Sequence, residues 1–284
     1  MKLKFYGARG SVPICGKEFQ KYGGNTTCLR IHREDANRIV IIDAGTGIRN
    51  LGKEIVNKGL KQNVINILFS HFHWDHIQGF PFFAPAYDSN QKIGIQVMGE
   101  QRKIKNLKEI FSMQMQKEYF PLELENMGAQ FEFLTHGDME TFYGAKVTVA
   151  PQHHKFPGGS YGLRIEDESV SIVVCTDIEH IDGIDENIVN LAKNADLLIH
   201  DGQYTPDEYK KHRGWGHSSW EQAVEVATLA KVKRLIITHH DPDHSDDFLD
   251  SMEKECQEVF PDSIFAKEGM EVSVDKPHQI LKTF

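Results

Sequence analysis

The stretch SHFHWDHIQG, residues 70–79, brings three histidines and one aspartate together within six positions, directly after an apolar run. Neutral imidazole and carboxylate are good ligands for zinc and for other transition metals. In a loop that leaves a strand end, His71 and His73 can point toward one ion. After a turn, Asp75 and His76 can hold a second ion beside it. The stretch therefore predicts a site for two metal ions rather than an ordinary polar loop.

Short apolar runs separated by polar segments continue along the whole chain. We expect strands at residues 2–7, 28–33, 38–43, 64–70, 94–99, 146–151, 161–166, 171–177, 196–201, 234–240 and 270–274. We expect helices at residues 46–58, 100–118, 185–194, 218–231 and 245–259. Strands dominate first and strand–helix alternation follows, which predicts an α/β (α+β) fold with two packed sheets and helices outside. No linker interrupts the chain, so we expect a single domain over residues 1–284.

Two apolar features lie outside the metal-ligand pattern. Residues 100–130 form a helical insertion rich in Met and Phe, and an apolar stripe at helical spacing most often covers a core. The alternatives are a lid over the site or the surface of a homodimer. Trp74, which lies between the ligands, is expected to pack beneath the loop rather than to line a pocket.

Charge and composition restrict the partners. The net charge of −9 argues against binding of an extended nucleic acid, which depends on many Lys and Arg side chains, but it does not exclude a small anionic substrate. No apolar run is long enough to span a membrane, and the start of the chain lacks the apolar segment of a signal peptide. The four cysteines lie far apart, which is typical of a reducing cytoplasm.

Further ligand candidates follow three later apolar strands. His153 and His154 follow the strand expected at 146–151, Asp177 ends the strand expected at 171–177, and a histidine pair ends the strand expected at 234–240. Each alone is most often an ordinary surface residue. Together they stand at carboxyl ends of strands, where they can converge on one rim, and the Asp177 carboxylate can bridge two ions.

These residues resemble a known superfamily. HFHWDH matches the H-x-H-x-D-H motif of the metallo-β-lactamase superfamily, and His154, Asp177 and His239 follow in the order of that superfamily. Asp43, after RIVII, resembles the aspartate of its first motif, which orders the loops around the site. The resemblance covers nearly the whole chain and implies a four-layer αββα sandwich with the metals at one edge between the sheets.

Five further segments narrow the resemblance to the ribonuclease Z and cyclic-nucleotide phosphodiesterase branch: GARGSVP, GGNTTC, HKFPGGSYGLRI, LLIHDGQYT and GHSSWEQA. In this branch the third-motif histidine stands ahead of a proline, which favours His154 over His153. His239 is favoured over His240 because it directly follows the strand residue Thr238.

The segment GHSSWEQA has a further implication, because it resembles the ribonuclease Z motif H-S-T-x-x-x-A. In that motif the histidine is a catalytic group that does not bind metal and is paired with an acidic residue. The resemblance assigns these roles to His217 and Asp201. The chain has Ser219 where the family usually has threonine, and both side chains carry a hydroxyl.

The chemistry expected from these residues is hydrolysis of a phosphodiester with two divalent ions, zinc first, with manganese or iron as alternatives. His217 would be the general acid, and Asp75 both a ligand and a proton acceptor. Ribonuclease Z enzymes carry a tRNA-gripping arm for which the short segment EDESVS (166–171) leaves no room. We therefore expect a cyclic nucleotide or another small phosphodiester as the substrate.

Three alternatives remain at this point. The runner-up is a tRNA 3′-processing endoribonuclease of the ribonuclease Z type. The same metal site could instead hydrolyse a thioester or a lactone. A di-iron redox protein is a third class, but such relatives usually have glutamate at the position of His73.

Overall fold

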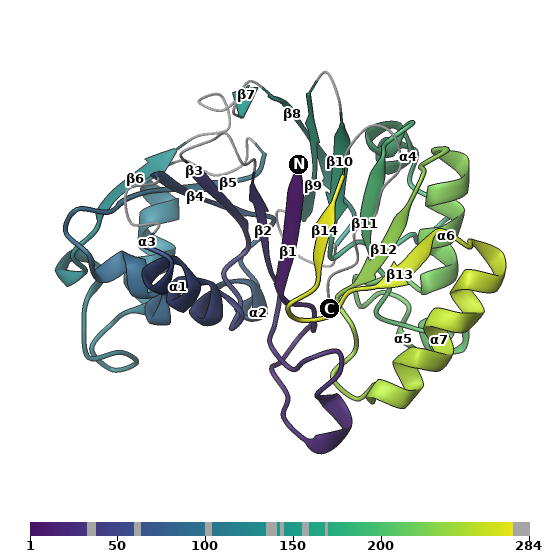
Figure 1. Cartoon of the computed structure of the whole chain (residues 1–284), viewed down its shortest axis with the longest axis horizontal. Helices are drawn as coiled ribbons and strands as arrows, with labels where there is room; N and C mark the ends of the chain where they lie inside the picture. The colour runs from purple at the N-terminus through teal and green to yellow at the C-terminus, as the bar shows by residue number, and fades with distance from the viewer. Residues whose placement is uncertain are drawn as a thin grey trace.

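The computed structural model describes residues 1–32, 38–59, 64–99, 104–134, 141–142, 145–154, 159–167 and 170–274. Two seven-stranded sheets face each other, and helices cover the outer face of each sheet (Figure 1). This arrangement is the αββα sandwich, so the expected fold class is confirmed. Parts of three expected features lie outside the described residues: 100–103 of the insertion, 155–158 after His154, and 168–169 of EDESVS.

The first sheet has the strand order β14-β1-β2-β3-β4-β5-β6. Its strands are β1 (Lys2–Gly7), β2 (Cys28–His32), β3 (Arg38–Ile42), β4 (Val64–Phe69), β5 (Lys92–Val97), β6 (Gln130–Leu134) and β14 (Glu271–Ser273). The strands from β3 to β6 run parallel to one another. Its helical segments are α1 (Ile48–Asn57), α2 (Trp74–Ile77), α3 (Ile104–Gln114) and the short turns η2 (Phe80–Phe82), η3 (Ala84–Tyr87) and η4 (Leu124–Asn126).

The second sheet has the strand order β13-β12-β11-β10-β9-β8-β7. Its strands are β7 (Thr141–Phe142), β8 (Ala145–Gln152), β9 (Ser160–Glu166), β10 (Ser171–Cys175), β11 (Leu197–Asp201), β12 (Leu235–Thr238) and β13 (Ser263–Phe265). The strands from β10 to β13 run parallel. The associated helices are α4 (Glu186–Ala192), α5 (Pro206–His212), α6 (Trp220–Leu229) and α7 (Asp246–Val259), and η1 (Lys17–Phe19) lies in the first long loop.

Alternation of buried side chains explains the four layers. In β3, Val40 and Ile42 pack into the core between the sheets, whereas Ile39 and Ile41 pack beneath the helices of the first half. Successive side chains of a strand point to opposite faces, so a strand that is apolar at every position must be covered on both sides. The second sheet follows the same rule, and its outer face packs against α4, α6 and α7.

The described part of the insertion, residues 104–130, covers the outer face of the first sheet. Leu107 and Phe111 of α3 are buried in the same cluster as Ile65 and Ile67 of β4. Other apolar side chains of this region remain exposed, and Tyr119 keeps 75% of its surface. A dimer surface in this region therefore remains a prediction. The organisation of the chain as a single domain also remains a prediction.

The sequence prediction missed β6, β7, β13, α5 and the single turn α2. The strands β7 and β13 have only two and three residues, which is too short for a visible period of two. Helix α5 buries none of its residues and so carries no apolar stripe. Its start is fixed instead by a capping box between Thr205 and Glu208.

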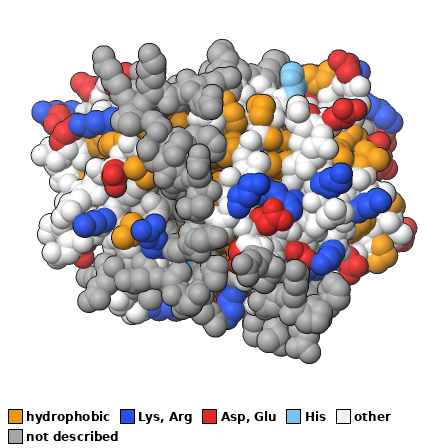
Figure 2. Space-filling model, turned by 90° about the horizontal axis from the view of Figure 1, so that it is seen from above, with side chains coloured by type: hydrophobic (Ala, Val, Ile, Leu, Met, Phe, Trp, Pro, Cys, Tyr) orange, Lys and Arg blue, Asp and Glu red, His pale blue; other side chains and the backbone are white. Residues whose placement is uncertain are grey.

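The upper end of the molecule in Figure 1 shows basic side chains among acidic ones, not a continuous basic surface of described residues (Figure 2). At the same end, β9 and β10 pair directly, and Asp167 donates its backbone N–H to Val170 across the turn. The chain therefore has no space for an arm between these strands. No helix in the described part of the chain is long and apolar enough to cross a membrane.

Candidate metal centre

The first half of the site comes from one short segment after β4. His71 and His73 lie in the extended residues that follow the strand, and Asp75 and His76 belong to the single turn α2. Helix α2 lies where the two halves of the molecule meet (Figure 1). The turn directs Asp75 and His76 back toward the strand end, so all four side chains point toward the same site.

The second half of the site comes from separate strands. His154 follows β8, Asp177 follows β10, Asp201 ends β11, and His239 follows β12. Strands β10, β11 and β12 are parallel, and β8 has the same direction because two antiparallel pairings separate it from β10. Their carboxyl ends therefore meet at one edge of the sheet, as the sequence predicts.

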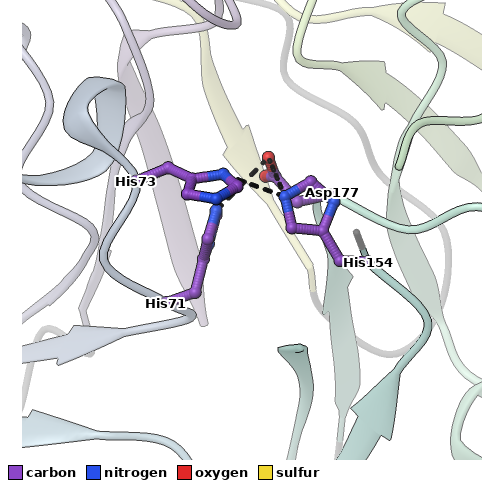
Figure 3. Close-up of side chains that lie close together, drawn as sticks. All are labelled: His71, His73, His154 and Asp177. Atoms are coloured by element: carbon purple, nitrogen blue, oxygen red, sulfur yellow. Dashed lines mark hydrogen bonds and ion pairs between the residues drawn. The ribbon is translucent and has the colours of Figure 1, made fainter. Parts of the chain in front are cut away.

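The structure brings the predicted ligands together in two groups. Within each group, one ligand atom from every residue lies within 4.8 Å of the others. The groups are His71, His73, His154 and Asp177, and Asp75, His76, Asp177 and His239. Figure 3 shows the first group, in which His71 and His73 approach from one half and His154 and Asp177 from the other. Asp177 belongs to both groups, which is the position required of a bridging carboxylate.

The histidines are fixed through their second ring nitrogen. His76 donates from Nδ1 to Asp43 Oδ2 at 2.8 Å. Ser70 Oγ donates to the same oxygen at 2.8 Å and lies 3.1 Å from His71 Nδ1. Because its own proton is used, Ser70 Oγ accepts a hydrogen bond from His71 Nδ1. Asp43 therefore orients both rings, His76 directly and His71 through Ser70. Such outer partners set the tautomer of a metal-binding histidine and keep Nε2 directed at the ion.

The second half uses neutral acceptors for the same purpose. His154 donates from Nδ1 to the carbonyl oxygen of Gly216 at 2.7 Å. His239 Nδ1 lies 3.1 Å from Gln203 Oε1. In both residues Nε2 is left for the centre of the site.

The donor atoms fit divalent ions. His71 Nε2, His76 Nε2 and Asp177 Oδ2 are buried and form no hydrogen bond of acceptable geometry, although His76 Nε2 lies 3.2 Å from Asp177 Oδ2. Buried polar atoms without partners cost free energy, so they usually mark a bound group. Imidazole nitrogen and carboxylate oxygen are also the donor types of zinc, manganese and iron sites.

Backbone strain is concentrated at the same residues. Asp43, Asp177 and His239 have φ values of 60°, 57° and 64°, in the left-handed region that residues other than glycine seldom adopt. Asp43 and His239 directly follow the last residue of an apolar strand, and Asp177 comes one position later, after Thr176. Such strain persists where the surrounding structure requires one orientation of the side chain.

Electrostatics in the site favours the charged form of Asp177 and His239, whereas burial lowers the pKa of His71, His73 and His154. Burial opposes ionisation of Asp177, but His239, His76 and His71 outweigh burial and hold its pKa well below the usual range. Burial likewise lowers the pKa of His239, but Asp177, Asp75 and Asp201 reverse the effect and raise it to about 9. Bound ions displace such protons, so metal binding here releases protons.

Asp201 and His217 form a hydrogen-bonded pair beside the ligands. His217 Nδ1 lies 2.8 Å from Asp201 Oδ2, and its ring stacks on that of His239 at 4.8 Å. Asp201 is fully buried and also accepts from the backbone N–H groups of Asp177 and Ser218. The pair is thus held beside the ligand groups, and the Asp201 carboxylate orients the His217 imidazole.

The neighbouring candidates are placed elsewhere. The His153 side chain is exposed, whereas that of His154 is buried in the first group. His240 bonds to the carbonyl oxygen of Ala266 and stacks on Phe265, away from the ligands. The prediction for Trp74 was wrong: its side chain is 59% exposed, because the one-turn helix α2 directs Asp75 and His76 inward and leaves Trp74 toward solvent.

Three supporting residues were missed from the sequence. Ser70 and Gln203 orient His71 and His239, and the backbone N–H of Ser11 donates to Asp75 Oδ2 at 2.8 Å. Gln203 follows Asp201 by two positions at a strand end, which is a signal that could have identified it. A backbone donor such as Ser11 leaves no signal in side-chain type.

Comparison with known proteins supports the assignment. A family model described as "Beta-lactamase superfamily domain" matches residues 38–272. The chain belongs to this superfamily. It is similar to ribonuclease Z of Picrophilus torridus, with 26% identity over 99% of this chain and 98% of the relative. That alignment spans 324 positions, more than the 284 residues of this chain, so the relative has segments that this chain lacks.

Solved structures of the superfamily share the fold. The short form of human tRNase Z matches with a TM-score of 0.66 and 18% identity, over 96% of this chain and 98% of its own. A diphosphatase from the PhnP family matches with a TM-score of 0.66 and 19% identity, over 96% and 98%. The ribonuclease Z relatives confirm the predicted branch. The chain is therefore a metallo-β-lactamase-fold hydrolase, and its fold implies divalent metal ions.

Proposed function

We propose that the protein is a phosphodiesterase that uses two divalent ions, zinc in the first instance, and acts on a cyclic nucleotide or another small phosphodiester. The ligands would be His71, His73, His154 and Asp177 for one ion, and Asp75, His76, Asp177 and His239 for the other. When bound, such ions polarise a phosphoryl oxygen and activate water. Orphaned nitrogen and oxygen atoms at the centre of both groups support this assignment.

The observation that carries the phosphodiesterase assignment is the pair of Asp201 and His217. Cleavage of a phosphodiester leaves an alkoxide, which needs a proton as the P–O bond breaks. His217 is fixed through Nδ1 by Asp201, so Nε2 remains to donate that proton. Asp75 accepts a hydrogen bond from Ser11 N, lies 3.2 Å from His239 Nε2, and would accept the proton of the attacking water. A site for thioesters has less need of a separate acid, because a thiolate leaving group is a weaker base than an alkoxide.

The small substrate is supported by the connection between β9 and β10. Only residues 167–170 join these strands, where the ribonuclease Z resemblance places a tRNA-gripping arm. The net charge of −9 also argues against binding of an extended nucleic acid. The relatives named ribonuclease Z favour the second candidate, a tRNA 3′-processing endoribonuclease.

A turnover screen tests the proposal. The protein, loaded in turn with Zn²⁺, Mn²⁺ and Fe²⁺, is assayed on bis(p-nitrophenyl) phosphate, cyclic nucleotides, a 3′-extended tRNA precursor, an acyl thioester and nitrocefin. We expect cleavage of the small phosphodiesters and little of the tRNA. Rapid thioester cleavage with no phosphodiester turned over would overturn the proposal, and efficient tRNA cleavage would establish the second candidate.

Location in the cytoplasm and action without a membrane partner complete the proposal. All four cysteines are unpaired, and three of them are buried. Free thiols of this kind fit a reducing compartment.

A further inference from the structure

Glu179 is a buried carboxylate that the chemistry above does not use. Its side chain is 1% exposed, and no Lys or Arg of the described chain forms an ion pair with it. Its two oxygens instead accept the backbone N–H groups of Gly214 and Gly216, the second at 2.8 Å. A buried charge costs free energy unless it is hydrogen-bonded, so these two contacts are what allows a carboxylate here.

The loop that Glu179 holds touches both kinds of functional side chain. Gly216, whose N–H bonds to Glu179, accepts from His154 Nδ1 through its carbonyl oxygen at 2.7 Å. The next residue is His217. Gly216 is thus held from both sides, by Glu179 at its nitrogen and by a predicted ligand at its oxygen.

The segment that carries Glu179 is tied into the site at further points. Asp177, two residues earlier, belongs to both ligand groups. The carbonyl oxygen of Ile178 accepts from Ser218 Oγ at 2.6 Å, and the N–H of Glu179 donates to the carbonyl oxygen of His153 at 2.8 Å. Residues 177–179 therefore join the end of β8, which is followed by His154, to the loop before α6 that carries His217.

The loop needs an external contact to keep one conformation. Gly214 and Gly216 have φ values of 86° and 94°, where glycine is at ease and most residues are not. Glycine also has more backbone freedom to lose than any other residue. The N–H groups of Gly214 and Gly216, on either side of Trp215, donate two charge-assisted hydrogen bonds to one carboxylate, and these bonds offset that loss.

We propose that Glu179 is a positioning residue that fixes the loop 214–217 and thereby sets the orientation of His154 toward its metal ion and of His217 toward the leaving group. This inference rests on the two-metal function proposed above. Removal of an outer partner of a metal-binding histidine typically costs about 10- to 100-fold in metal affinity or activity. The second ligand group has no member whose Nδ1 depends on this loop, so it should be spared.

The test is Glu179→Gln, which keeps the shape but directs an amide N–H₂ toward a backbone donor. Metal-free protein is titrated with Zn²⁺ in competition with a chromophoric chelator, and turnover is measured on an alkyl phosphodiester, whose leaving group needs the proton of His217. We expect one of two zinc ions to bind about 10- to 100-fold more weakly, the other unchanged, and kcat to fall by at least about tenfold. Glu179→Asp, which keeps the charge, should recover part of both losses.

A matched control separates positioning from general stability. Asp196 is another largely buried carboxylate, which accepts from Ser171 N and Oγ at the opposite end of β10. Asp196→Asn should lower the melting temperature and leave both zinc affinities unchanged. In a Trp74→Phe, Trp220→Phe background, in which Trp215 is the one tryptophan left in the sequence, Glu179→Gln should also lower the fluorescence anisotropy of Trp215, which lies between the two held glycines, while Asp196→Asn should not.

The outcomes are distinguishable. If wild-type protein binds two zinc ions and Glu179→Gln binds both equally well with unchanged kcat, Glu179 has no positioning role. The inference is also overturned if Asp196→Asn reproduces the loss of one zinc ion. If wild-type protein binds only one ion, the two-metal proposal fails. In that case the role of Glu179 is overturned separately if Glu179→Gln leaves both the affinity for that zinc ion and the Trp215 anisotropy unchanged.

Discussion

The two halves of the molecule build the site in different ways. The first half places four ligand candidates in six residues after β4, so one loop determines their relative positions. The second half takes one residue from each of several strand ends. These ends meet only because the strands from β8 through β12 pair with their neighbours in one sheet. A local motif tolerates changes elsewhere in the fold, whereas a distributed set depends on the whole sheet.

The difference also separates two tasks. The loop of the first half supplies ligand candidates, one of which, Asp75, would also accept the proton of the attacking water. The second half supplies ligands too, but adds the pair of Asp201 and His217 and the bridging position of Asp177. We infer that metal capture depends on both halves and that the proton needed by the leaving group comes from the second.

Asp177→Asn should have the largest effect, because it removes the one carboxylate shared by both groups. Binding of both ions should weaken, and turnover should fall by about 10³-fold or more, equivalent to about 4 kcal/mol. His73→Ala in the first half, which belongs to one group only, should leave about one ion bound. Metal analysis after gel filtration measures this contrast. Equal loss of metal in both variants would show that the shared position of Asp177 has no consequence.

His217→Ala should reduce turnover while metal content stays complete. Loss of a general acid typically costs about 10²- to 10⁴-fold. The loss should be largest for substrates with a basic alkoxide leaving group and small for p-nitrophenolate, which leaves without a proton. The comparison is made between an alkyl and a p-nitrophenyl phosphodiester. A uniform loss on both substrates, or loss of metal, would count against the role of His217.

A smaller effect concerns buried histidines outside the site. Burial and the neighbouring His200 lower the pKa of His180 to about 3, so the folded protein keeps it neutral. Between the unfolded value of about 6.5 and about 3, only the unfolded chain binds this proton, so stability falls as the pH falls through this range. At pH 5 the contribution is about 2 kcal/mol. His180→Gln should lose less stability than the wild type between pH 7.5 and pH 5 in urea unfolding. An identical pH dependence would show that His180 is protonated in both states.

The sequence predicted most of the fold because its apolar runs are strong and regular. VINILF has one polar residue, Asn66, and SIVVC is apolar after its first serine, and the loop HFHWDH keeps its ligand candidates adjacent. The elements that it missed, such as β13 and α5, are held by pairing and capping rather than by an apolar pattern.

The site was predictable to a different depth in each half. His71 to His76 could be identified from the residues alone, whereas Asp201 and His217 needed the family resemblance, since sixteen residues separate them. Trp74 was misplaced because sequence spacing does not show which way a one-turn helix faces. Glu179 and Ser11 act through backbone N–H groups, and such contacts exist only once the chain is folded.

The central claim is that the two halves together hold two ions that act on a phosphodiester. The most direct measurement is turnover of bis(p-nitrophenyl) phosphate as Zn²⁺ is added stepwise to metal-free protein. The account predicts that activity rises until two equivalents per chain are bound and then stays level. Full activity at one equivalent, or no activity with two ions bound, would contradict it.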